Sequence, residues 1–260
     1  MNLSYFQTLR QLLIKSFVIY QPQFKSKIIN GLIWSGITIL VTAYIMPHIG
    51  LKGYGAFMVA TTAVSWGFFS TINNIAALVS DITNEGSNLT YELTLPVPQW
   101  IIFAKYALVN AYQAFIITLL IIPFGKLLVW SEFTFEHFQF FKFYFMLALS
   151  CLFFGFFSVL VSSMTENIYN MDDVWLRIIF PIWFLGGFQF SWKTLYSISP
   201  TLAFINLLNP LTYALEGARS VALNPELSLP YWLCVSALIF ASGLFGYIGI
   251  MNLKKRLDCL

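Results

Sequence analysis

Long stretches without a single charged side chain constrain this chain more than any other feature. One of them runs from Tyr54 to Ser80. A helix needs roughly 20 apolar residues to cross the hydrocarbon core of a bilayer, which is about 30 Å thick. Across the chain, 58% of residues are hydrophobic and 10% are charged, whereas soluble domains carry about 25% charged residues. The sequence therefore predicts an all-α membrane protein with one domain over residues 1–260.

The apolar stretches predict six transmembrane helices, near residues 28–46, 54–80, 100–124, 143–164, 174–192 and 229–251. Residues 1–27 are amphipathic and predict a helix in the membrane interface; a soluble helix packed on another protein is the alternative. Residues 193–228 contain an uncharged stretch with Pro200 and Pro210, which each lack a backbone donor. This segment could be a kinked seventh span or short re-entrant helices. A seventh span would put the Lys254-Lys255-Arg256 cluster outside, so a re-entrant external hairpin is expected.

The positions of the basic residues predict the orientation. With six spans, both termini lie on one side, together with Arg10, Lys15, Lys25, Lys27, Lys105, Arg177, Lys254, Lys255 and Arg256. The opposite side carries Lys52, Lys126, Lys142, Lys193 and Arg219. The positive-inside rule makes the richer side cytoplasmic. Lys105 is expected to extend its side chain to the interface from one end of the third span.

Other classes of protein find little support. A formal charge of +3 that is spread over the chain does not predict nucleic-acid binding. Cys151, Cys234 and Cys259 lack the paired arrangement of a disulfide framework. His48 and His137 lack metal-ligand spacing, so no metal site is expected. The N-terminus shows no secretory signal peptide.

The loop from Asp81 to Trp100 is the most informative part of the predicted cytoplasmic side. Ile82, Gly86, Leu89 and Leu93 recur at helical spacing on one face, and Asp81, Glu85, Asn88 and Glu92 occupy other faces. Pro96 and Pro98 end the helix. Such an amphipathic helix is suited to a groove on a partner protein. A solvated connector is the alternative.

These residues resemble the type-2 permease family of ABC transporters, the membrane subunits of exporters. That family places a coupling helix here, with an acidic residue before Gly, spaced leucines and a proline turn, as in Glu85-Gly86, Leu89, Leu93 and Pro96-Val97-Pro98. A second set of matching residues follows in order: Asp172-Asp173, Pro181, Leu185-Gly186-Gly187, Asn209-Pro210-Leu211-Thr212-Tyr213 and Arg219. The resemblance assigns Gly186, Gly187, Asn209, Pro210, Tyr213 and Arg219 to an exit hairpin. The chain departs from the family at Ser191-Trp192, where a proline is frequent, so the detail of the exit hairpin is open.

The resemblance implies a mechanism with two kinds of subunit. No G-x-x-x-x-G-K-[ST] phosphate loop is present, so ATP and Mg²⁺ are expected on a separate ABC ATPase. Two permease copies and two ATPase copies are implied, in a bacterial inner membrane, with the coupling helix as the ATPase contact. Asp at Leu89 and Leu93 is expected to weaken that contact without unfolding the spans. The implied substrate is amphiphilic: a lipid-linked glycan, a lipid or a hydrophobic drug.

Several polar and aromatic residues in or near spans remain open to two interpretations. Asn73, Asn74, Asn110 and Gln113 are expected either to bond between helices or to line a substrate pathway and dimer interface. Trp residues near span ends are typical interface anchors, although aromatic side chains can also stack on ring-containing substrates. An intramembrane enzyme would need a clustered nucleophile, base or metal set, which the sequence lacks. A structural or assembly protein is the other alternative.

Overall fold

The computed structural model describes residues 3–50, 53–84, 88–130, 133–223 and 225–258. The described residues are helical and contain no strand, as the sequence predicts. The helices of the first half are α1 (Leu3–Leu40), η1 (Val41–Ile45), η2 (Met46–Ile49), α2 (Tyr54–Thr83), α3 (Asn88–Leu93), α4 (Gln99–Thr118) and α5 (Ile121–Leu128). Those of the second half are α6 (Phe140–Met164), η3 (Ile168–Asn170), α7 (Met171–Val174), η4 (Trp175–Ile179), α8 (Phe180–Leu185), α9 (Trp192–Ile198), α10 (Pro200–Asn206), α11 (Pro210–Ala222), η5 (Pro225–Leu227) and α12 (Tyr231–Asp258).

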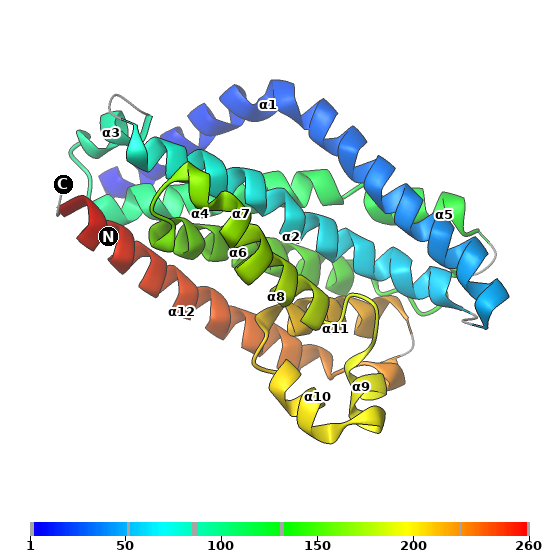
Figure 1. The fold of residues 1–260 in the computed structure, drawn as a ribbon. Helices are drawn as coiled ribbons and strands as arrows, with labels where there is room; N and C mark the ends of the chain where they lie inside the picture. The colour runs from blue at the N-terminus through cyan, green and yellow to red at the C-terminus, as the bar shows by residue number, and fades with distance from the viewer. Residues whose placement is uncertain (1–2, 51–52, 85–87, 131–132, 224, 259–260) are drawn as a thin grey trace.

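Five helical stretches of the described chain are long and apolar enough to cross a membrane: Tyr5–Ile49, Tyr54–Thr83, Gln99–Leu128, Phe140–Met164 and Tyr231–Leu257. The predicted spans 28–46, 54–80, 100–124 and 143–164 fall within four of these stretches, and the predicted span 229–251 begins two residues before the fifth. The predicted span 174–192 corresponds to α7, η4 and α8, which together end at Leu185. This shorter segment runs beside α2 in Figure 1. The chain is therefore a multi-pass helical membrane protein.

The first helix joins two elements that the sequence analysis treats separately. α1 continues without interruption through residue 27, where the interfacial helix was expected to end. Pro22 lies inside α1 and lacks the backbone donor that would bond to Val18. Figure 1 shows α1 bent near its middle, which is the expected effect of an internal proline.

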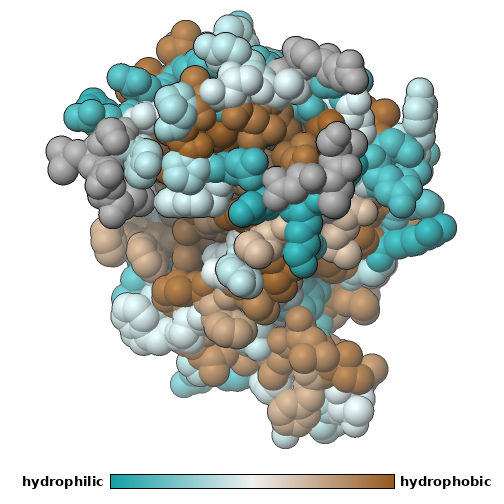
Figure 2. Space-filling view, turned by 90° about the vertical axis from the view of Figure 1, so that its left-hand side faces the viewer, coloured by the Kyte–Doolittle hydropathy of each residue, from teal (hydrophilic) through white to brown (hydrophobic). Residues whose placement is uncertain are grey.

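Both termini and α3 lie at the same end of the molecule, on the left of Figure 1. Polar side chains gather on this end in Figure 2, whereas the protrusion at the bottom, formed by α9 and α10, is largely apolar. We refer to the end that carries α3 as the coupling end, after the coupling helix that the sequence analysis predicts there. The turns near Gly50 and the helices α9 to α11 lie away from it.

Glycines bring three of the long helices into direct backbone contact. A Cβ at Gly155 of α6 would lie 2.1 Å from the backbone oxygen of Ala107 in α4. A Cβ at Gly249 of α12 would lie 2.9 Å from the backbone of Leu160 in α6. Small residues at helix interfaces allow such close approach in membranes. The helices α4, α6 and α12 therefore form one tightly packed unit.

The segment 193–228 folds as short helices rather than as one kinked span. Pro200 and Pro210 occupy the first turns of α10 and α11, where the missing backbone donor has no partner to lose. Ser199 and Asn209 cap these two helices with their side chains. Most of α11 is buried against α2, α6 and α12.

Candidate functional site

The short helix α3 lies at the coupling end, but its apolar face is turned toward its own chain. Leu89 is 1% exposed and packs in a cluster with Leu78, Ile82 and Phe103. Leu93 is partly buried against the same cluster. The expectation that this apolar stripe enters a partner groove is therefore not met, because the stripe anchors α3 to α2 and α4. Glu85 and Gly86 lie outside the described residues.

A buried ion pair fixes α3 to α4. Glu92 is 2% exposed and Lys105 is 4% exposed. The Lys105 Nζ donates to both carboxylate oxygens of Glu92, at 2.9 and 2.6 Å. Lys105 therefore pairs inside the protein and does not extend to the interface as the sequence analysis expected. The Lys15 Nζ of α1 lies 3.7 Å from the same carboxylate, so Glu92 connects three helices.

The face of α3 that remains accessible is polar and aromatic. Asn88, Thr90, Tyr91 and Thr94 are exposed, and Tyr91 is 62% exposed. The predicted proline turn follows: Pro96 is exposed, and the Pro98 carbonyl accepts a hydrogen bond from the Ile101 amide, 2.9 Å away, as α4 begins. This accessible face, defined by Asn88, Tyr91 and Thr94, is the part of α3 that a partner protein can reach.

The four amides proposed for a pathway or dimer interface separate into two groups. Asn110 donates to the Ser158 hydroxyl at 2.7 Å, and Gln113 accepts from the Lys27 Nζ at 3.1 Å. Both amides are buried, so they bond between helices of one chain. Asn74 is partly buried, whereas Asn73 is exposed on α2. An exposed amide in a membrane span is expected to face protein or water rather than lipid.

Two small polar cavities lie between α1, α2 and α4. One, of about 80 Å³, is lined by residues that include Lys27, Trp66 and Asn73. The other, of about 20 Å³, is lined by residues that include Asn74, Asp81 and Asn110. Cavities of this size hold water molecules but not an amphiphile. A substrate that large needs a path other than these two cavities.

Arg219 is the centre of the predicted exit hairpin. Its side chain is 1% exposed, and its Nη1 lies 2.6 Å from the Glu216 carboxylate, which is equally buried. The guanidinium also donates to the Thr61 hydroxyl at 3.1 Å and to the carbonyls of Phe190 and Gly187. Burial lowers the pKa of Arg219, and the Glu216 carboxylate opposes this effect.

Glu216 also accepts hydrogen bonds from the segments before and after α11. Its carboxylate accepts hydrogen bonds from the Trp192 amide at 3.0 Å and from the Leu229 amide at 3.1 Å. The ion pair therefore connects α2, the turn after α8, the start of α9 and the approach to α12. Sequence reasoning missed Glu216, although an acidic residue three positions before Arg219 in an apolar segment is a recognisable helical ion-pair pattern.

The other predicted hairpin residues have local structural roles. Gly187 has a φ of +87°, which glycine adopts without strain, and it forms the turn after α8. A Cβ at Gly186 would lie 2.7 Å from the Ile182 carbonyl. The Asn209 amide donates to that same carbonyl at 2.6 Å. Pro210 begins α11, and the Tyr213 hydroxyl donates to the Leu207 carbonyl at 2.9 Å.

Comparison with known proteins identifies the family of the chain. A protein-family model described as ABC-2 type transporter matches residues 3–223. The match covers most of the chain, including α3, both buried ion pairs and most of the segment predicted as the exit hairpin. A search of curated proteins found no match.

Among the described residues, no group of three or more His, Cys, Asp or Glu side chains is arranged to hold a metal ion.

Proposed function

The chain belongs to the ABC-2 type transporter family, and on that premise we propose that it is the permease subunit of an ATP-driven exporter in a bacterial inner membrane. Membership makes the chain a multi-pass ABC transporter permease that associates with an ABC ATPase. In the proposed assembly, two permease copies and two ATPase copies work together. ATP and Mg²⁺ bind to the ATPase subunits, whose conformational change moves the permease.

The proposed orientation puts the coupling end in the cytoplasm with both termini. The positive-inside rule supports this orientation, because the basic residues Lys254, Lys255 and Arg256 occur near the C-terminus. Figure 1 draws both termini beside α3. In this orientation α3 faces the ATPase, and α9 to α11 form a hairpin that dips into the outer leaflet.

The proposal that α3 contacts the ATPase rests on the accessible face of this helix. Tyr91 projects from a helix that is held from beneath by Leu89 and by the Glu92–Lys105 ion pair. A helix anchored in this way transmits an applied displacement to α2 and α4, whereas a loosely attached helix would move alone. Large amphipathic aromatics such as Tyr are enriched among residues that dominate protein interfaces. We therefore assign Asn88, Tyr91 and Thr94 to the ATPase contact.

Tyr91→Asp tests this assignment. We expect the variant to retain less of the ATPase during co-purification, because a charge replaces an exposed aromatic side chain at the contact. The thermal unfolding temperature of the permease itself should be unchanged. Tyr196→Asp, at an exposed position of α9, is the matched control and should retain the ATPase fully. Wild-type ATPase retention by Tyr91→Asp would refute the assignment.

Comparison of Leu89→Asp with Tyr91→Asp separates an effect on ATPase binding from an effect on folding. Because Leu89 is 1% exposed, a carboxylate there is expected to destabilise the coupling end as well as to reduce ATPase binding. The sequence analysis expected Asp at Leu89 to leave the spans folded, whereas the burial of Leu89 favours a loss of stability at the coupling end. Burying a charge without a partner is strongly unfavourable. A lowered unfolding temperature for Leu89→Asp but not for Tyr91→Asp is the expected result.

The proposed transport pathway lies between two permease copies and includes the face around Asn73. Phe69 lines the same cavity as Asn73, and its ring lies 5.7 Å from that of Trp175 in η4. Trp175, Phe180 and Phe184 are exposed apolar side chains. A face that combines an amide with aromatic rings is suited to an amphiphilic substrate such as a lipid-linked glycan, a lipid or a hydrophobic drug.

A further inference from the structure

A groove between α4, α6 and α12 lies away from the Asn73 face. It has a volume of about 440 Å³ and is lined by apolar residues that include Ala104, Leu152, Phe156 and Ile239. Ser242 also lines it, but the Ser242 hydroxyl donates to the Leu238 carbonyl of its own helix at 2.7 Å. The groove is therefore largely apolar along its length, with Tyr247 also in its lining, and the Ser242 hydroxyl is already hydrogen-bonded.

The groove is open because α12 carries a glycine where a side chain would otherwise project. A Cβ at Gly243 would meet no atom within 4 Å, whereas a Cβ at Gly246 would lie 2.8 Å from the Phe156 ring. The space beside Gly243 is thus unfilled by protein, and Phe156 forms the floor beside Gly246. A hydrocarbon chain from the surrounding bilayer can occupy it.

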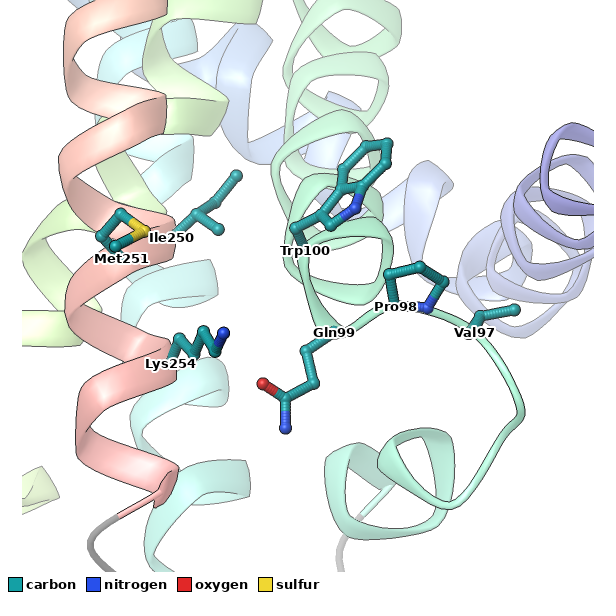
Figure 3. Close-up of a pocket in the computed structure, with 7 residues that line it drawn as sticks. All are labelled: Val97, Pro98, Gln99, Trp100, Ile250, Met251 and Lys254. Carbon is teal, nitrogen blue, oxygen red and sulfur yellow. The ribbon is translucent and has the colours of Figure 1, made fainter. Parts of the chain in front are cut away.

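At the coupling end the groove continues into a wider pocket with a cationic rim. This pocket, of about 660 Å³, shares Trp100 and Ile250 with the groove and is also lined by Gln99 and Lys254. Figure 3 shows Lys254 and Gln99 facing each other across the gap between α12 and α4, with Ile250 and Trp100 farther along the helices. Lys254 is exposed, and no carboxylate with a described side chain lies within salt-bridge distance of it.

The length of the groove along α12 corresponds to the hydrocarbon thickness of one bilayer leaflet. From Ile239 to Ile250, α12 rises about 16 Å at 1.5 Å per residue. Half of a hydrocarbon core about 30 Å thick is roughly 15 Å. Lys254 follows Ile250 by one turn, so its ammonium lies at the depth of the headgroups. Basic residues at this depth attract anionic lipids.

We propose that this groove binds one anionic phospholipid, with an acyl chain along Ala104, Phe156 and Gly243 and the headgroup phosphate at Lys254. The site is separate from the proposed pathway around Asn73. Charge favours lipid over a second copy of the chain. A symmetric contact would place the same patch of both copies together, and Lys254 and Lys255 of one copy would then face those of the other.

Native mass spectrometry of the full-length chain in detergent tests the site, with phosphatidylglycerol and phosphatidylcholine as probes. We expect one phosphatidylglycerol to bind more tightly than phosphatidylcholine. Lys254→Gln should weaken phosphatidylglycerol binding about fivefold, the factor that corresponds to the contribution of one basic residue near an anionic surface. Lys142→Gln, at an exposed position near the start of α6, should leave the affinity unchanged.

A second pair of variants tests the acyl-chain part of the groove. Gly243→Leu should fill the open space and reduce binding of both lipids, and the fold can accept this change because a Cβ at position 243 would meet no atom within 4 Å. Ser236→Leu adds the same side chain at an exposed position of α12 outside the lining and should have no effect. Equal affinity for both lipids in the wild type, or unchanged binding in Gly243→Leu, would overturn the proposal. So would loss of permease dimers in Gly243→Leu, because the groove would then be an interface between copies.

Discussion

Buried charges determine how the chain is held together at the scale of single residues. The Glu92–Lys105 pair lies at the coupling end, and the Glu216–Arg219 pair lies among the hairpin helices. All four side chains are at most 5% exposed. Removing one partner from such a pair leaves an uncompensated buried charge, whereas replacing both partners by apolar residues is often tolerated.

Glu92→Gln tests the anchoring of α3. We expect it to lower the free energy of unfolding by about 3–5 kcal/mol, the range for breaking a buried ion pair, because Lys105 keeps its charge without a carboxylate. Thermal unfolding of the purified chain measures this effect. The double variant Glu92→Met/Lys105→Met should recover much of the loss. Additive losses in the double variant would contradict the pairing.

The sequence contains part of this residue-level information. The spacing of Leu89 and Leu93 correctly predicts one apolar face, but spacing does not reveal whether that face meets another protein or the same chain. Glu92 and Lys105 are 13 positions apart and separated by a proline turn, so no helical periodicity connects them. Their pairing emerges only when α3 folds back on α4.

Packing of whole helices depends on a few glycines, and Gly155 offers a direct test. Gly155→Ala should lower the unfolding temperature, because its Cβ would lie 2.1 Å from the Ala107 carbonyl oxygen and force α4 and α6 apart. Gly243→Ala makes the same chemical change on α12, where nothing lies within 4 Å, and should leave stability unchanged or raise it. Equal effects of the two substitutions in a thermal unfolding assay would contradict this account of the helix contact.

Some element boundaries were predictable from long apolar runs with charged or proline-rich ends. The predicted spans 54–80 and 143–164 fall within α2 and α6, whereas the predicted span 174–192, between Asp173 and Lys193, ends as a helix at Leu185. The limit of residue 27 between the interfacial helix and the first span was not observed, because an amphipathic helix can continue directly into an apolar one. The effect of Pro200 could not be predicted, because a proline can either kink a helix or begin one. In the structure Pro200 begins α10, and the Ser199 side chain caps this helix.

At the scale of the whole molecule, one chain is expected to be incomplete as a transporter. The two polar cavities between α1, α2 and α4 are about 80 and 20 Å³, which is too small for an amphiphile. Asn73 is exposed on α2, where lipid would be an unfavourable neighbour. The small cavities offer no pathway between α1, α2 and α4, and the exposed amide supports a pathway between two copies.

Cross-linking through position 73 tests this arrangement. In a variant without Cys151, Cys234 and Cys259, Asn73→Cys should yield a dimer with a short bifunctional thiol reagent in membranes. Phe240→Cys, at a 71% exposed position of α12, is the control and should remain monomeric on a denaturing gel. Cross-linked dimers from position 240 but not from position 73 would put the dimer interface on α12 and contradict the proposed interface at Asn73.

The bend near Pro22 divides α1 into a first and a second half. Its first half touches the coupling end through Lys15, and its second half is tied to α4 where Lys27 donates to Gln113. Leu40 follows Pro22 by about 27 Å of helix at 1.5 Å per residue. A tilt of about 10° at the proline would displace the far end by roughly 5 Å over that length. Under the proposed coupling mechanism, a displacement of the first half of α1 at the coupling end would therefore give a larger displacement at Leu40.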